Sequence, residues 1–441
     1  MFEGLVRFTP DGRIEPSLAL SWKWVDETTM QFKLRKGVRF HDGEPFDAES
    51  VKFSINRYLD PKIHFPAFGF ISSLKAVEII DPYTVNIITC FPDGLLLNRL
   101  AAFVVMVPAS YADREETDLE NRPVGTGAFR FKSWDRTREL RLEANPDYWD
   151  RNHPKVDGLV FKFLPMEEQV DALLRGDIDI LTSLPGTRTL AIQKNPDTTV
   201  IKKRTFYTVA GSFNIGRKPL SNKRIRQALN LAVDKDDLIH YDILGNGRPI
   251  AGLSMADEFG HSTQVDPYPY NPKKAKQILK EEGYPDGFRL KVFLKANAER
   301  TGQIVAAYLA RVGVVLDLTI VTDAEIFKYL EDGNRWDMLI ADCPDPMYHS
   351  YFISAAFLYS KSPFSISPNP EFDKRLETII RTLDLEKQKL LSEDLDRYIH
   401  DEALALFTYQ RTRTYGLRRG LEFVPYTSGM HYFQSVTKTE K

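Results

Sequence analysis

Between residues 290 and 341 the chain alternates strand-like and helix-like apolar patterns, and this order restricts the fold more than any other feature. Leu290 to Leu294 predicts a strand, Thr301 to Val312 a helix, and Val314 to Val321 a second strand. A strand, a helix and a strand in this order form a right-handed βαβ unit with parallel strands. Trp336 to Ala341 is a further apolar run, which we expect in the same sheet. The chain is therefore predicted to have an α/β fold.

A carboxylate closes the last of these runs. Trp336 to Ala341 is apolar apart from Asp337, and Asp342 follows it directly. Pro344 and Pro346 come next, and because proline cannot donate to a ladder we expect the strand to end at Asp342. The C-terminal ends of strands in open α/β sheets lie beside the ligand crevice. A buried carboxylate there requires a helix N-terminus, a basic side chain or a cationic ligand as its partner.

The same aspartate has a second interpretation as local structure. Aspartate is common in turns and at helix N-termini, and a helix is expected to begin near Tyr348. Asp342 and Asp345 would then cap that helix and bind no ligand. The residues alone leave both interpretations open.

The rest of the chain also predicts mixed strands and helices. Met30, Phe32 and Leu34 alternate with polar residues, as in a half-buried strand. Asp47 and Ser221 are candidate N-caps of helices. Further helices are expected over residues 166–175, 372–383 and 385–400 and from Asn271 onward, and a strand-rich segment over Leu404 to Tyr415. A polar stretch from Ala112 to Arg122 is a candidate domain boundary.

Length and composition exclude several classes of protein. A chain of 441 residues suggests two or three domains, and 43% hydrophobic with 27% charged residues excludes a disordered chain. A net charge of −2 gives no basic face for nucleic acid. The longest apolar run, Leu100 to Pro108, is too short to span a membrane. Two cysteines, Cys90 and Cys343, exclude a disulfide framework and a multi-cysteine zinc site.

No catalytic motif is present among those we sought: a His-Glu-x-x-His helix, a P-loop lysine, a nucleophile elbow or a dinucleotide glycine pattern. Gly125-Thr126-Gly127 is better explained as a close backbone crossing than as a phosphate loop. His41 lies in a predicted turn, where a solvated or capping histidine is favoured over a metal ligand. His349 follows the Asp342 segment, so we keep it as a candidate ligand contact. We therefore expect a protein that is not an enzyme and holds neither cofactor nor metal.

Nine segments, in this order, carry a resemblance to a known family: Leu18–Trp22, Phe32–Gly43, Pro45–Val51, Val124–Phe129, Asn145–Trp149, Arg175–Asp179, Arg224–Leu229, Ala275–Leu279 and Gly283–Gly287. Together they resemble the family 5 extracellular solute-binding proteins, the peptide- and nickel-type receptors of bacterial ABC importers. The resemblance covers nearly the whole chain. No signal peptide follows Met1, and family members carry residues ahead of the segment that begins at Phe2. The resemblance therefore implies an exported protein whose first segment is absent from this chain.

The resemblance implies a two-lobed periplasmic-binding-protein-like fold, of type II and in the large family 5 form, with a ligand cleft between the lobes and a satellite domain. We expect residues 1–111 to form the satellite domain, 112–205 with 410–441 the large lobe, and 206–409 the second lobe. The implied function is the substrate-binding component of an ABC importer, with a short peptide as ligand. Receptors for a nickel chelate, a glycan or an opine remain alternatives, as do an intracellular ligand-sensing domain and a hydrolase.

The resemblance also implies site residues. An aspartate that matches Asp342 holds the ligand's α-ammonium in peptide-binding relatives, although Leu339 stands here where the family has an aromatic residue. Met338 and Ile340 would offer backbone groups to a peptide, as in strand addition. Lys295 lies near the segment that supplies a cation for the ligand's carboxylate. The implied partners are the small ligand and the permease subunits of the importer, with no nucleic acid, and the protein is expected to be a periplasmic or extracytoplasmic membrane-associated monomer.

Overall fold

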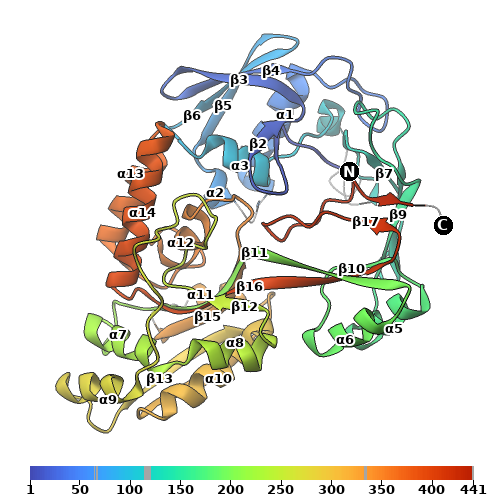
Figure 1. The fold of residues 1–441 in the computed structure, drawn as a ribbon. Helices are drawn as coiled ribbons and strands as arrows, with labels where there is room; N and C mark the ends of the chain where they lie inside the picture. Colours follow the sequence, from blue (N-terminus) through green and yellow to red (C-terminus); the bar gives the residue numbers. More distant parts are fainter. Residues whose placement is uncertain (64, 66–67, 114–120, 332–334, 440–441) are drawn as a thin grey trace. The chain divides into compact units, whose positions relative to one another are not determined.

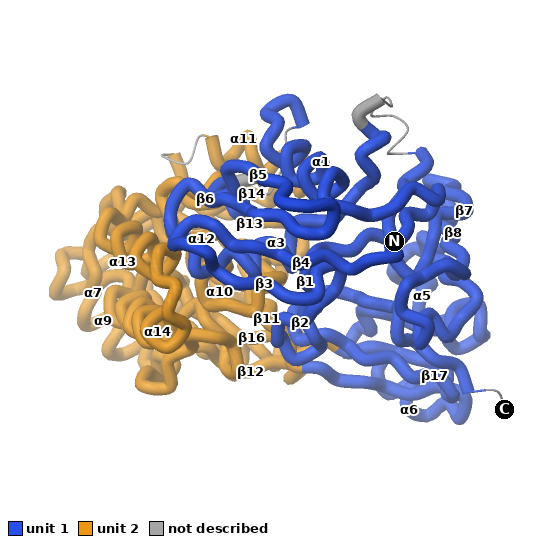
Figure 2. Tube along the Cα trace, turned by 90° about the horizontal axis from the view of Figure 1, so that it is seen from above, with its two compact units in different colours: residues 1–203, 414–441 blue, residues 204–413 orange. Residues whose placement is uncertain are grey.

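The computed structural model describes residues 1–63, 65, 68–113, 121–331 and 335–439. Seven residues of the candidate boundary, 114–120, lie outside this description. The chain forms two compact units, one of Met1–Lys203 with Thr414–Lys441 and the other of Arg204–Arg413 (Figure 2). The chain passes from one unit to the other within two long strands, β11 (Thr198–Phe213) and β16 (Ala405–Arg418).

The first unit contains an antiparallel sheet in the order β3-β4-β6-β5. Its strands are β3 (Ala19–Asp26), β4 (Thr29–Leu34), β6 (Thr84–Thr89) and β5 (Leu74–Asp81). The alternation predicted at Met30, Phe32 and Leu34 is confirmed, since these three side chains are buried in β4. Helix α1 (Ala48–Leu59) begins at the predicted N-cap, where an Asp47 carboxylate oxygen accepts the backbone N–H groups of Glu49 and Ser50.

A three-stranded sheet of the same unit consists of β7 (Phe129–Asp135), β8 (Glu139–Ala144) and β9 (Gly158–Lys162). Gly125 and Gly127 lie against the chain's first residue, so closely that a Cβ at either position would meet the Met1 carbonyl oxygen at 2.4 or 2.5 Å. The close backbone crossing predicted for this segment is therefore confirmed. His41 is part of the same crossing, since its Nε2 lies 2.9 Å from the Gly127 carbonyl oxygen.

Short helices and strands make up much of the rest of the described part of this unit. They are β1 (Val6–Phe8), β2 (Ile14–Pro16), α2 (Phe68–Ile71), α3 (Leu96–Phe103), α5 (Met166–Arg175), β10 (Ile180–Leu181), α6 (Thr189–Lys194), β17 (Leu421–Glu422) and β18 (Thr437–Lys438).

The second unit contains the βαβ unit that the sequence predicts. Strands β13 (Phe288–Lys295) and β14 (Val314–Val321) pair in parallel, and helix α10 (Glu299–Ala310) connects them. Strand β15 (Met338–Pro344) pairs in parallel with β13 and antiparallel with β11, so the strand order within this unit is β16-β11-β15-β13-β14. The short strand β12 (Gly247–Pro249) pairs with β16.

The predicted end of β15 at Asp342 is wrong, because the strand continues to Pro344. Cys343 and Pro344 pair with Thr208 and Tyr207 of β11. A proline at the last position of a strand loses only one donor, so it is tolerated there. Asp342 consequently lies inside the ladder with β11 and not beyond it.

Helices complete the second unit (Figure 1). They are α7 (Lys223–Ala232), α8 (Lys235–Ile243), α9 (Pro272–Glu281), α11 (Ile326–Glu331), α12 (Tyr351–Leu358), α13 (Pro370–Arg381) and α14 (Leu385–Asp401). The predicted N-cap Ser221 is off by one residue, since Asn222 accepts the Arg224 N–H at 2.9 Å.

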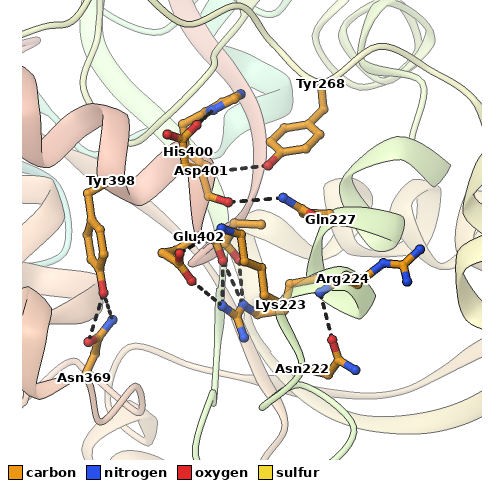
Figure 3. A network of polar contacts seen from close by, with 12 residues as sticks. Asn222, Lys223, Arg224, Gln227, Tyr268, Asn369, Tyr398, His400, Asp401 and Glu402 are labelled. Carbon is orange, nitrogen blue, oxygen red and sulfur yellow. Dashed lines mark hydrogen bonds and ion pairs between the residues drawn. The ribbon is translucent and has the colours of Figure 1, made fainter. Parts of the chain in front are cut away.

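A polar network joins the start of α7 to the end of α14 (Figure 3). The Lys223 ammonium lies 2.8 Å from a carboxylate oxygen of Glu402, and Gln227 donates to the Asp401 carbonyl oxygen. The buried guanidinium of Arg226 donates to the backbone carbonyl oxygens of Leu220, Glu402 and Ala403. Carbonyl groups at a helix C-terminus have no partner within the helix, so this part of the segment 224–229 has a structural role.

Candidate functional site

The candidate site is centred on Asp342, in the part of β15 that pairs with β11. The phenol of Tyr207 on β11 donates a hydrogen bond to one carboxylate oxygen of Asp342. The ammonium of Lys295 lies 3.0 Å from the other oxygen. We call these three residues the Asp342 site.

Strand pairing assembles this site from distant parts of the chain. Lys295 is the last residue of β13, and the parallel pairing of β13 with β15 brings it beside Asp342. Tyr207 comes from the antiparallel neighbour on the other side. The Lys295 ammonium also lies 2.9 Å from a carboxylate oxygen of Asp323, a residue that follows β14 and is largely exposed. A single lysine thus bridges two carboxylates.

Both partners of the main ion pair are charged at neutral pH. Burial raises the pKa of the Asp342 carboxyl, but the hydrogen bond from Tyr207 and the nearby Lys295 ammonium outweigh burial and hold it below its usual value. Burial likewise opposes the charge of Lys295, and its two carboxylate partners outweigh this effect and raise its pKa. The Asp342 side chain is 10% exposed and that of Lys295 is 23% exposed, so solvent screens the pair only in part.

The capping interpretation of Asp342 does not fit these contacts. Helix α12 begins after Ser350 without a side-chain cap. Asp345 is the residue that orders the turn ahead of it, because its carboxylate accepts the backbone N–H groups of Met347 and His349 at 2.7 and 2.8 Å. Asp342 instead accepts from the phenol of Tyr207 and forms an ion pair with the ammonium group of Lys295.

Strand addition at Met338 and Ile340 does not fit the observed pairing. Met338 pairs with Phe213 on one side and Val292 on the other, and Ile340 pairs in the same way with Gly211 and Leu294. A peptide strand needs a free edge, and both edges of β15 are occupied at these two residues. Their side chains are buried in the core of the unit.

His349 lies in the turn between β15 and α12, in the interior of the second unit. Its side chain is 3% exposed, and its ring centre is 4.7 Å from that of Phe259. The Nδ1 atom accepts the backbone N–H of Tyr351 at 3.0 Å. A ligand contact by His349 would therefore require this segment to rearrange.

Sequence reasoning missed Tyr207. It lies 135 positions from Asp342, and a tyrosine within a strand is common, so no local pattern marks it. The guanidinium groups of Arg411 and Arg413 on β16 lie over its ring, 5.6 and 5.8 Å from the ring centre. Tyr207 thus contacts a carboxylate through its hydroxyl and two guanidinium groups through its ring.

A second polar cluster in this unit consists of the carboxyl groups of Glu258, Asp345 and Asp396, with His261 beside them. We call it the buried carboxyl cluster. Glu258 and Asp345 interact directly, and their side chains are 5% and 0% exposed. Asp396 accepts the backbone N–H of Ser262 at 3.0 Å and lies 3.7 Å from Nδ1 of His261. The three carboxyl groups are buried, so they affect stability and do not form a binding surface.

Two negative findings apply to the part of the chain that the structure describes. It contains no group of three or more histidine, cysteine, aspartate or glutamate side chains arranged to hold a metal ion. None of its helices combines the length and the apolar character that crossing a membrane requires.

Comparison with known proteins agrees with this fold. The glutathione-binding protein GsiB of Pectobacterium atrosepticum is 28% identical over 424 residues, which cover 92% of this chain and 82% of that protein. The match to GsiB of Salmonella paratyphi A is 27% identical and covers 72% of this chain and 63% of that protein, less than two thirds of its length.

Two solved structures have the same fold. The ABC transporter-associated periplasmic binding protein DppA of Helicobacter pylori, in complex with the peptide STSA, is 25% identical with a TM-score of 0.86, over 100% of this chain and 92% of that one. The PBP AgaA from A. tumefaciens R10, in complex with agropinic acid, is 24% identical with a TM-score of 0.86, over 100% and 93%. Residues 13–363 match the family model described as bacterial extracellular solute-binding proteins, family 5 Middle. The chain therefore belongs to this family, whose members are the substrate-binding receptors of ABC importers and not enzymes.

Proposed function

We propose that this receptor binds a short peptide and that Asp342 binds its ammonium group. The observation that carries the proposal is the Asp342 site itself, where a largely buried carboxylate already accepts an ammonium group, that of Lys295, and a phenol O–H. A relative that binds glutathione and a similar protein in complex with the peptide STSA support a peptide as ligand.

In this proposal the ligand replaces Lys295 at Asp342. The incoming ammonium takes the carboxylate oxygen that faces Lys295, and Tyr207 keeps its hydrogen bond to the other oxygen. Lys295 retains Asp323 as its partner, so no buried charge is left without a counterion. We keep His349 as a weaker candidate, while Met338 and Ile340 are no longer proposed to act through their backbones.

The two-lobed mechanism is part of the same proposal. Residues 206–409 would form one lobe, residues 112–205 with 410–441 the large lobe, and residues 1–111 a satellite domain. The two strands that pass between the units, β11 and β16, would provide the hinge. A loaded, closed receptor would deliver the peptide to permease subunits at the outer face of the cytoplasmic membrane, in the periplasm or associated with the membrane. Small-angle scattering with and without ligand tests closure, because an unchanged radius of gyration at saturation would contradict it.

The test of the binding site uses Asp342→Asn, with Asp323→Asn as its matched control. Both variants remove a carboxylate partner of Lys295, but only the first removes the proposed ammonium site. The probes are glutathione and the tetrapeptide Ser-Thr-Ser-Ala, each with a free and an acetylated N-terminus, measured by calorimetry. A charged hydrogen bond in a buried site contributes roughly 1.5–3 kcal/mol, so Asp342→Asn should weaken the free probes by about 10- to 150-fold.

Asp323→Asn should leave both affinities nearly unchanged, because Asp323 is exposed. The acetylated probes should bind the wild type weakly and lose little more in Asp342→Asn. Equal losses for free and acetylated probes would contradict the assignment of Asp342. If the wild type binds neither peptide but binds a nickel chelate, a glycan or an opine in the same assay, the peptide proposal itself is wrong.

A further inference from the structure

The Asp342 site contains a cation of its own. The Lys295 ammonium lies 3.0 Å from Oδ1 of Asp342, and because Lys295 belongs to the same chain, dilution cannot remove it. A ligand that brings an ammonium group to Oδ1 must therefore displace this lysine first. The affinity of the site then depends on how firmly Lys295 is held there.

Two observations indicate that Lys295 can leave Asp342. Their contact is an ion pair, and no hydrogen bond of favourable geometry reaches the buried Oδ1 atom from the described residues. Asp323 offers the ammonium a second carboxylate at 2.9 Å, and its side chain is 81% exposed, whereas that of Asp342 is 10% exposed. Lys295 can thus move toward solvent with Asp323 as its partner, which leaves Oδ1 to a donor that forms a well-aligned hydrogen bond.

We propose that Lys295 is a built-in competitor, which occupies Asp342 until the ammonium group of a ligand displaces it and thereby lowers both the affinity and the selectivity of the receptor. The inference rests on the proposed ammonium site at Asp342 and concerns the regulation of that site. A lysine that bound an anionic group of the ligand would instead raise the affinity. The two roles of Lys295 therefore predict effects of opposite sign.

The effect on selectivity follows from the cost of an unpaired buried charge. A ligand without an ammonium group leaves Lys295 at Asp342, so the carboxylate keeps its counterion and the penalty for such a ligand is small. Without Lys295, the same ligand would cover a carboxylate that has no cationic partner, whereas a ligand with an ammonium group would supply one. Removal of the Lys295 charge should therefore favour the ligand with the ammonium group.

The experiment measures by calorimetry how Lys295→Met binds glutathione and Ser-Thr-Ser-Ala, each with a free and an acetylated N-terminus. The variant should bind the free probes about tenfold more tightly than the wild type, a value between those of exposed and buried ion pairs, and the acetylated probes no more tightly. Lys295→Arg keeps the charge and should not strengthen binding. Lys291→Met, which changes an exposed lysine of the same strand, is the matched control.

A double-mutant cycle tests whether Lys295 acts through Asp342. In the Asp342→Asn background, Lys295→Met should leave the affinities unchanged, because the lysine has no carboxylate to occupy there. Thermal unfolding verifies that each variant is folded, and Lys295→Gln takes the place of Lys295→Met if the latter does not fold.

The inference is wrong if the charge-removing variant weakens the free probes or leaves their affinity unchanged, if Lys295→Arg strengthens them equally, or if the gain persists in Asp342→Asn. Failure of the proposed function has a different signature, namely equal losses for free and acetylated probes in Asp342→Asn, and the inference then fails with it. Both also fail if neither the wild type nor the charge-removing variant binds any probe. Binding by the variant alone would support the inference.

Discussion

The buried carboxyl cluster should make the stability of this receptor depend on pH, and Glu258→Gln isolates its main contribution. Burial, followed by the nearby Asp345 carboxylate, raises the pKa of the Glu258 carboxyl well above its usual value. Burial also raises the pKa of Asp345, to about 6, and that of Asp396. There is therefore a pH range in which the unfolded chain has released the protons of these acids. In that range the folded protein must either keep them protonated or ionise them at a cost in free energy.

The sign of the effect follows from proton linkage. An acid whose pKa is higher in the folded protein binds more protons when folded, so stability falls as pH rises from its unfolded pKa to its folded pKa. Burial lowers the pKa of His261, which gives the opposite slope, but only below the unfolded histidine pKa of about 6.5. Among the three acids, Glu258 is the one whose pKa is raised well above its usual value, so it should contribute most to the change in protonation on folding above this pH.

The magnitude is set by one proton. A full proton bound on folding changes the free energy of unfolding by about 1.4 kcal/mol per pH unit, which corresponds to roughly 3–6 °C in Tm for a unit of 150–250 residues. Lys235 is buried, and desolvation lowers its pKa to about 8, so it contributes a rising slope in the same range. The difference in slope between wild type and variant is therefore the quantity to measure.

The assay is thermal unfolding of the full chain between pH 6.5 and 8.5. Glutamine keeps the shape of Glu258 and can donate an N–H to Asp345, so the variant should fold. As pH rises, its free energy of unfolding should decrease less steeply than that of the wild type, by up to about 1.4 kcal/mol per pH unit, the value for one full proton. Glu386→Gln, an exposed glutamate of the second unit, is the matched control and should follow the wild-type slope. Parallel slopes for wild type and Glu258→Gln would refute the argument that Glu258 retains a proton on folding.

Two further predictions concern stability alone. Arg226→Met should lower the free energy of unfolding by about 3 kcal/mol or more, because three backbone carbonyl oxygens lose their donor. Arg224→Met on the same helix breaks only exposed ion pairs, so it should change stability by less than about 1 kcal/mol in the same thermal unfolding assay. Similar losses for the two variants would contradict the structural role of Arg226. Gly287→Ala should lower Tm by much more than Gly283→Ala does. Both glycines have a positive φ, which costs an L-residue about 1–2 kcal/mol. Only at position 287 would the added Cβ also clash, since it would come within 1.8 Å of the Gly313 carbonyl oxygen, whereas a Cβ at position 283 meets nothing within 4 Å.

The elements that local patterns determine could be predicted from the sequence. The βαβ unit was predicted because its strands and helix each have their own periodicity, and the Asp47 cap because a cap needs only its neighbours in sequence. The end of β15 was predicted wrongly because the proline rule ignores that β11 already pairs with this segment. Partners of a strand are non-local, and a local pattern carries no information about them.

The same reason explains which part of the candidate site the sequence could reveal. Asp342 is recognisable as a carboxylate after an apolar run, but its contacts depend on strand order. Tyr207 and Lys295 reach it only because β11 and β13 are the two neighbours of β15. Met338 and Ile340 were assigned a role that requires a free edge, and the same two neighbours remove that edge.

The strand order also explains how one short stretch of sheet can present alternating charge. Four adjacent strands contribute polar side chains: Arg411 and Arg413 from β16, Tyr207 from β11, Asp342 from β15 and Lys295 from β13. The sequence of charges across the strands is a cation, a neutral phenol, an anion and a cation. The phenol contacts both of its neighbours, since it donates to the Asp342 carboxylate and its ring lies beneath the Arg411 guanidinium. Under the proposed function an incoming ammonium group would replace Lys295 at Asp342, and the Lys295 ammonium balances the charge of that carboxylate while no ligand is bound.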